Sequence, residues 1–319
     1  MRPTCNASSQ TRRVRRFACT SGIATFLLCA CGQREGVVGR QHTVDAATSA
    51  ARFESEFVTN AGLWNVETAL AGASVNFGVA DASARDGNIA ELVFPGDAAR
   101  SGTDSVGPDY VTQLSTRDRF GFGTLRSRLN FGGCSGTEEV VQAVLGYFSD
   151  GADHDGNGIT DDIEIDLQIT CGAPRLVYLS VYTDYQATPS GEQVRKLSHI
   201  VDLSTGAEYD TPRDDSDTFV QSGTTASLAR PNLATTGAFY EIGYEWHVGS
   251  VRFFINDGGQ ELTLWTLADP SHVPQQPVYL TYNLWHPASH WFPNLAEADF
   301  PANNVVMKVD WISFEPSAN

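Results

Sequence analysis

Residues 162–169 read Asp-Ile-Glu-Ile-Asp-Leu-Gln-Ile, an alternation typical of a β-strand with one face in a core. Successive side chains of a strand point to opposite faces, so Glu164, Asp166 and Gln168 share one face. Two carboxylates with Cα atoms about 6.6 Å apart repel each other when both are ionised. The pair therefore indicates acid–base chemistry, and the alternative is a solvated face of an acidic protein. Four aliphatic side chains take the opposite face: Ile163, Ile165, Leu167 and Ile169.

Similar short apolar-alternating runs recur from Ala51 onward, separated by Gly, Asn, Asp and Pro. Asn256-Asp257-Gly258-Gly259 predicts a hairpin turn, because such a turn needs residues with positive φ. Residues 210–227 are polar and predict a long loop. The sequence indicates one all-β sandwich over residues 51–319. The clearest predicted strands are 123–131, 140–148, 163–169, 176–182, 239–246, 250–255, 278–284 and 305–314.

Charge excludes two classes of partner. The 319 residues hold 21 Lys and Arg against 38 Asp and Glu, which gives a net charge of −17. Such a chain is a poor ligand for nucleic acid or for anionic lipid headgroups. No apolar run reaches the roughly 18 residues that a membrane-spanning helix needs.

The N-terminus predicts export. Residues 1–30 read as a signal peptide, with four Arg at 12–16 before the apolar residues 17–30. Leu28-Cys29-Ala30-Cys31 resembles the bacterial lipoprotein box, which implies cleavage before Cys31 and lipidation of its thiol. An ordinary signal peptide with a chance cysteine is the alternative. We expect a monomer at the outer membrane or cell surface, with residues 31–50 as a flexible tether.

Two cysteines remain in the exported body. Cys134 and Cys171 form an even pair in an oxidising compartment, where a disulfide is expected. Closing that loop contributes roughly 3–4 kcal/mol to stability on the chain-entropy model. The alternative is two free buried thiols.

With the strand of residues 162–169, the sequence resembles family-16 glycoside hydrolases, whose active-site strand reads E-x-D-x-E. Four further stretches agree with that family in order: 120–128 (FGFGTLRSR), 244–257 (YEWHVGSVRFFIND), Asn283-Leu284-Trp285 and Val309-Asp310-Trp311-Ile312. The resemblance spans roughly residues 120–315. It implies an antiparallel, two-sheet, concanavalin-like jelly roll, with a cleft for a β-linked polysaccharide and no required cofactor.

The resemblance also implies a retaining endo-β-glycosidase mechanism. Glu164 matches the nucleophile and Asp166 the carboxylate that tunes it. Gln168 stands where the family has its general acid/base, and an amide has no titratable proton to give. General acid–base catalysis contributes roughly 10²–10⁴-fold.

Three interpretations of Gln168 stay open. The domain is a non-catalytic glycan binder, or a slow enzyme that uses His286, His290 or Asp162 as the acid, or a strand with a bulge that presents another carboxylate. The bulged form of the motif would place Glu at position 169, where this chain has Ile.

Aromatic side chains should pack on the apolar faces of sugar rings, beside polar side chains that bind hydroxyls. The family match implies Trp285 as such a platform, with Asn283 beside it. Tyr244 and Trp246 alternate in the same way, and Trp291 follows Trp285 closely. We expect all five residues to bind substrate, although any single Trp is more often a core residue.

A second segment predicts calcium. Oxygen donors alternate in 153–161, with Gly158 at the sixth position, which suits a loop wrapped around a hard cation. The expected ligands are Asp153, Asp155, Asn157 and Asp161, and the alternative is a solvated Asn/Gly-rich turn. Family relatives also hold a structural calcium, which would involve Asp310.

Overall fold

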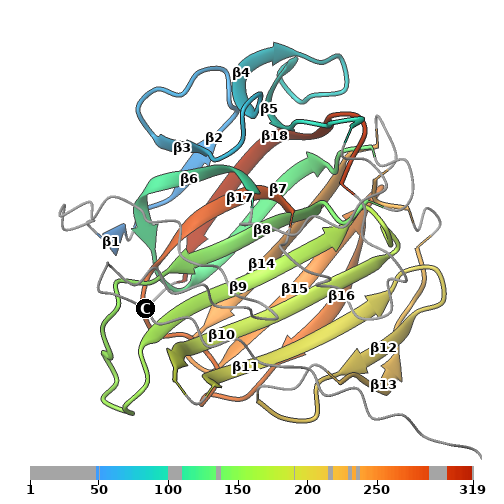
Figure 1. Ribbon diagram of the computed structural model, residues 1–319. Helices are drawn as coiled ribbons and strands as arrows, with labels where there is room; N and C mark the ends of the chain where they lie inside the picture. Colours follow the sequence, from blue (N-terminus) through green and yellow to red (C-terminus); the bar gives the residue numbers. More distant parts are fainter. Residues whose placement is uncertain are drawn as a thin grey trace, which may run out of the picture.

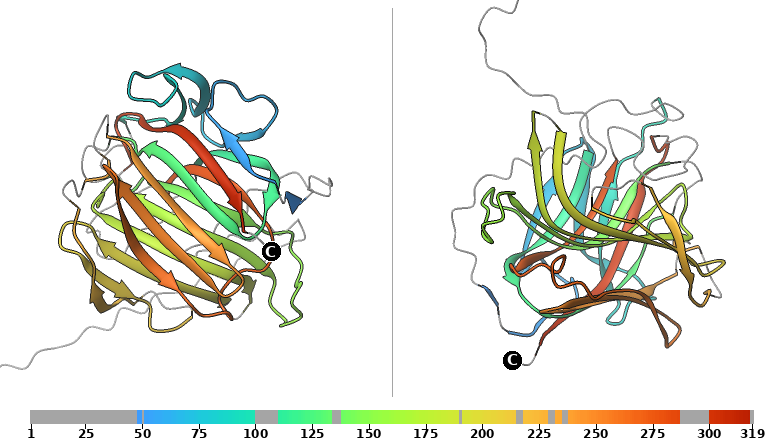
Figure 2. Two further views of the ribbon diagram at one scale, coloured as in Figure 1. Left: turned by 180° about the vertical axis from the view of Figure 1, so that it is seen from behind. Right: turned by 90° about the horizontal axis from the view of Figure 1, so that it is seen from below.

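The computed structural model describes residues 48–49, 51–99, 110–133, 138–189, 191–214, 218–228, 232–234, 238–286 and 300–317. Within these ranges all regular structure is β, so the described chain offers no helix that could cross a membrane. The strands form two sheets that stack as two layers (Figures 1 and 2). The predicted all-β, two-sheet jelly roll is confirmed.

The first sheet has ten strands. These are β1 (Thr48–Ser49), β3 (Trp64–Thr68), β6 (Tyr110–Phe120), β8 (Val141–Phe148), β9 (Asp161–Thr170), β10 (Leu176–Thr188), β11 (Gly191–Asp202), β12 (Ala207–Asp210), β13 (Val220–Thr224) and β17 (Val278–His286). Their order is β1-β6-β17-β8-β9-β10-β11-β12-β13, with β3 paired to β6. The strand of the acidic motif, β9, therefore lies in the middle of this sheet (Figure 1).

The second sheet has eight strands, ordered β16-β15-β14-β7-β18-β5-β4, with β2 paired to β18. Every pairing in the two sheets is antiparallel except that of β1 with β6, which is parallel. The strands of this sheet are β2 (Phe53–Ser55), β4 (Ser74–Ala80), β5 (Asn88–Phe94), β7 (Gly123–Asn130), β14 (Tyr240–His247), β15 (Ser250–Asp257), β16 (Gln260–Leu267) and β18 (Val305–Pro316).

The main core fills the space between the sheets. It takes the aliphatic side chains of β9, including Ile165 and Leu167, which are at most 1% exposed. The Oγ of Ser127 on β7 and the hydroxyl of Tyr282 on β17 lie 2.7 Å apart, which adds a polar contact between the sheets. Gly146 on β8 makes room for the second sheet, because a Cβ there would lie 2.8 Å from the Tyr244 hydroxyl.

The predicted hairpin turn joins β15 to β16. Gly258 and Gly259 have φ of +65° and +90°, backbone conformations that residues other than glycine rarely adopt. The Gly259 amide donates to Asn256 Oδ1 at 2.9 Å. The prediction from Asn256-Asp257-Gly258-Gly259 is confirmed.

The predicted loop over residues 210–227 is wrong in part, because it contains β13. This edge strand reads VQSGT and is largely exposed, and its apolar and polar residues do not alternate. It pairs with β12 alone. Backbone hydrogen bonding to a neighbour defines the strand here, and the side-chain pattern does not reveal it.

The core placement of β9 gives a first prediction. Leu167→Ala should lower the free energy of unfolding by about 2–5 kcal/mol, because it leaves a cavity between the sheets. Chemical denaturation measures this. Val66→Ala on β3 is the control, since Val66 is 45% exposed and its loss should cost within about 0.5 kcal/mol. Equal costs for the two variants would contradict the packing described.

Candidate functional site

The motif side chains of β9 point away from the core. Ile163, Ile165, Leu167 and Ile169 belong to the main core cluster, so Glu164, Asp166 and Gln168 face outward from the sandwich. We call this side of the first sheet, turned away from the second, the outer face. These three polar side chains are 7%, 1% and 3% exposed.

Strand register gives each motif residue defined neighbours. Asp166 lies between Leu145 on β8 and Ser180 on β10. The Ser180 hydroxyl donates to Asp166 Oδ2 at 2.7 Å and so fixes one carboxylate oxygen. This contact leaves Asp166 placed to influence Glu164, two residues along the same face.

Tyrosines flank the other two motif residues. Glu164 lies between Tyr147 and Tyr182, and Gln168 has Tyr178 as its partner on β10. Burial raises the pKa of the Tyr182 phenol well above its ordinary value, although the nearby Lys196 charge opposes this. The Lys196 ammonium lies 5.2 Å from the centre of the Tyr182 ring. Tyr182 is therefore a neutral hydrogen-bond donor beside Glu164 at physiological pH.

Sequence reasoning missed these tyrosines. Residues 176–182 were identified as a strand, and Tyr178 and Tyr182 are four residues apart within it, so they share a face. What the sequence lacked was the pairing of β10 with β9, which brings that face to Glu164 and Gln168.

Two of the predicted sugar-binding residues lie on the outer face. Asn283 pairs with Ala143, which in turn pairs with Gln168, so the three form one row across β17, β8 and β9. Trp285 is two residues further along β17 and shares this face. Neither residue belongs to the main core cluster, whereas Leu284 does.

Tyr244 and Trp246 do not line this surface, and their placement corrects the prediction. Both lie on β14 of the second sheet, are 1% exposed and belong to the main core. The Trp246 Nε1 donates to the Pro274 carbonyl at 3.0 Å. Period-two alternation identifies the inward face of a strand, and both sheets turn that face toward the same core.

The two substitute acids that lie within the described residues, His286 and Asp162, are not next to Gln168. His286 alternates with Trp285 and points inward, where its ring lies 5.2 Å from that of Phe300. Asp162 lies beyond Glu164, six residues from Gln168 along β9, which is roughly 20 Å. His290 and the expected platform Trp291 lie outside the described residues.

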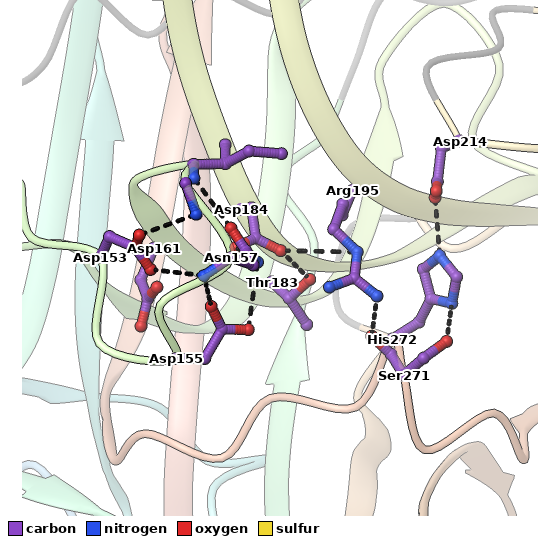
Figure 3. Close-up of polar contacts among 12 residues, drawn as sticks. Asp153, Asp155, Asn157, Asp161, Thr183, Asp184, Arg195, Asp214, Ser271 and His272 are labelled. Carbon is purple, nitrogen blue, oxygen red and sulfur yellow. Dashed lines mark hydrogen bonds and ion pairs between the residues drawn. The ribbon is translucent and has the colours of Figure 1, made fainter.

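The predicted calcium loop precedes β9. Carboxylate oxygens of Asp153, Asp155 and Asp161 lie within 4.8 Å of one another (Figure 3). Asp153 accepts the backbone amides of Gly156 and Gly158 at 2.7 and 2.8 Å, and these hydrogen bonds, that of Gly158 first, lower its pKa. Burial raises the pKa of Asp161. A bound cation would oppose this shift, because a positive charge nearby favours the ionised carboxylate.

Asn157 and Asp184 connect this loop to β10. The Asn157 amide donates to Asp184 Oδ1 at 2.8 Å, and its own oxygen accepts the Ile159 amide at 2.8 Å. Asp184 is 1% exposed and lies 3.8 Å from Arg195 Nε (Figure 3). The loop sequence predicted that Asp153, Asp155 and Asp161 lie together, and their carboxylates do. Asp184 reaches the loop only because β10 pairs with β9.

Asp310 lies in a second acidic group, with Glu56 and Asp86. Its buried carboxylate pairs with Arg128 and accepts the Arg85 amide at 2.9 Å. Arg85 also pairs with Glu56. Arginine charge already balances two of these carboxylates, so calcium at Asp310 stays a prediction that the contacts do not favour.

Of the cysteines expected in a disulfide or a lipid anchor, only Cys171 lies within the described residues. Cys171 is buried and disulfide-bonded. Cys134, its expected partner, lies outside the described residues, as do residues 1–47 with Cys31. The Cys134–Cys171 pairing and the lipid anchor stay predictions.

Comparison with protein-family models and with curated proteins finds no match for this sequence. Solved structures share its fold. A family-16 endo-glucanase from Bacteroides ovatus in complex with G4G3G-2F-DNP is 12% identical, with a TM-score of 0.50 over 82% of this chain and 99% of that one. A Bacteroides ovatus mixed-linkage glucan GH16 protein in complex with G4G4G3G product gives the same values. A native glycosidic hydrolase is 14% identical, with a TM-score of 0.50 over 86% and 99%.

The loop geometry gives a second prediction. Calcium should raise the melting temperature relative to EDTA, because a ligand at 100 times its Kd adds about 2.7 kcal/mol to folded-state stability. Asp155→Asn should remove this difference, whereas Asp310→Asn should keep it. Identical melting curves with calcium and with EDTA would contradict a cation site in residues 153–161.

Proposed function

We propose that this protein is a carbohydrate-active surface lipoprotein with a retaining endo-β-glycosidase type of site and impaired acid/base catalysis. One observation carries the proposal: Glu164, Asp166 and Gln168 share the outer face with Asn283 and Trp285. The fold is that of family-16 β-glucanases, and two of the similar structures hold β-glucan oligosaccharides or their derivatives. A β-linked polysaccharide is therefore the proposed partner.

The residues suit one half of a double displacement. Glu164 would attack the anomeric carbon as the glycosidic C–O bond breaks, which forms a glycosyl ester and releases the leaving oxygen. Asp166, oriented by Ser180, would tune the charge of that nucleophile. The leaving oxygen needs a proton unless it is a stable anion, and Gln168 has none to give.

The surroundings of Gln168 favour a second candidate function. Its cross-strand neighbours are Ala143 and Tyr178, neither of them a carboxylic acid, and His286 points into the core. A surface that binds β-glycan without turnover needs the same side chains and no acid. This alternative, a non-catalytic glycan-binding module, keeps the proposed substrate and removes the reaction.

Location rests on the sequence alone. We extend the proposal to an exported monomer whose Cys31 carries lipid, with residues 31–50 as its tether. Such an anchor would hold the outer face near polysaccharide at the cell surface.

An aryl β-glucoside with a good leaving group tests the chemistry, because its phenolate departs without a proton. We expect a burst of phenolate that equals the enzyme concentration, followed by slow turnover. Azide should speed the second phase, since it attacks the glycosyl ester without a base. Glu164→Gln is the control and should show no burst. Glycan retention on an affinity gel without any burst would favour the binding module.

Restoring the acid gives a further prediction. Gln168→Glu should raise turnover of an unactivated β-glucan by roughly 10²–10⁴-fold, the usual contribution of acid–base catalysis. Reducing-sugar release measures it, and Gln168→Asn is the matched variant that should gain nothing. Equal rates for all three proteins would count against position 168 as the missing acid.

A further inference from the structure

The row that contains Gln168 continues beyond β9. Tyr178 pairs with Ile200 on β11, Ile200 with Tyr209 on β12, and Tyr209 with Gln221 on β13. Directly paired residues of antiparallel strands project to the same side of a sheet. The outer face therefore carries one line of side chains from Asn283 to Gln221, which crosses seven strands.

Part of this line is apolar. Tyr178 and Ile200, 6% and 5% exposed, form a cluster of their own, separate from the main core. Half-buried side chains packed against them include Tyr209 and Phe219, and the Phe219 ring meets the Tyr178 ring edge to face at 5.9 Å. Such a cluster buries apolar surface on the outer face, and its half-buried rings, Tyr209 and Phe219, stay partly accessible.

Polar acceptors flank the cluster on the β9 side. Gln168 Oε1 and Asn283 Oδ1 are buried and have no hydrogen-bond partner within the described residues. Buried amide oxygens without partners cost stability unless a ligand or water supplies a donor. The Tyr178 hydroxyl lies 2.9 Å from Ser198 Oγ and its ring is buried, so the half-buried rings of Tyr209 and Phe219 are the ones that a ligand could reach.

We infer that Tyr209 on β12 and Phe219, directly before β13, form an additional glycan subsite on the far side of Gln168 from Asn283. This inference rests on the proposed function and deepens it. Strands lie about 4.8 Å apart, so β12 and β13 lengthen the row by roughly 10 Å. The protein would thus recognise an extended β-glycan chain rather than its end.

A sugar chain fits this row better than a peptide does. Pyranose rings present flat C–H faces to aromatic rings and hydroxyl donors to amide oxygens. The row offers both kinds of partner, because the amides of Gln168 and Gln221 lie on either side of the Tyr209 ring. A peptide added to the sheet would need an unpaired strand edge. Every strand along this row is paired on both sides from β8 to β12.

The test compares a β-glucan disaccharide with a hexasaccharide by calorimetry on the full chain. The unmodified protein should bind the hexasaccharide at least about tenfold more tightly, which corresponds to 1.4 kcal/mol. Tyr209→Leu and Phe219→Leu keep an apolar side chain but lose the flat ring, and each should remove most of that preference. Phe239→Leu, in an aromatic contact with Arg128 away from this row, is the control and should keep it.

Outcomes separate the two proposals. An unchanged length preference in both Leu variants, with thermal melting that shows them folded, overturns the additional subsite and leaves the proposed function standing. If a Leu variant unfolds, Gln221→Leu at the exposed end of the row gives the same comparison. Failure of the unmodified protein to bind either oligosaccharide overturns both proposals.

Discussion

Strand β9 must satisfy a dry core and a polar surface at once, and the rest of the structure follows from that constraint. Its aliphatic side chains fill the space between the sheets, which fixes the register of β8 and β10 on either side. A shift by one residue would bury Glu164 and Asp166 in hydrocarbon, where unpaired carboxylates are costly. The same packing that stabilises the sandwich therefore holds the two carboxylates on the outer face.

Neighbouring strands turn this face into a patterned surface. Ser180 orients Asp166, and tyrosines from β8 and β10 stand on both sides of Glu164. Gln168 has the length of a glutamate but no titratable proton. Its place in the row suits hydrogen bonding to a hydroxyl, so the two proposed functions, glycan binding and impaired hydrolysis, would use the same contacts.

Local patterns predicted much of this arrangement. The alternation in residues 162–169 predicted which side chains of β9 face outward, and Asn256-Asp257-Gly258-Gly259 predicted its hairpin. Pairing between distant strands was not predictable, and it decides that Tyr178 lies beside Gln168 and that Asp184 reaches the acidic loop of residues 153–161. The same gap explains the error at Trp246, whose alternation gave no sign of which surface its face would meet.

A crystal structure of the chain with a bound β-glucan oligosaccharide would show which face of the sandwich holds the sugar. We expect a pyranose ring over Glu164 and Gln168, with Asn283 and Trp285 in contact with the sugar chain. Sugar density elsewhere on the molecule, with the outer face of the first sheet bare at saturating ligand, would contradict it.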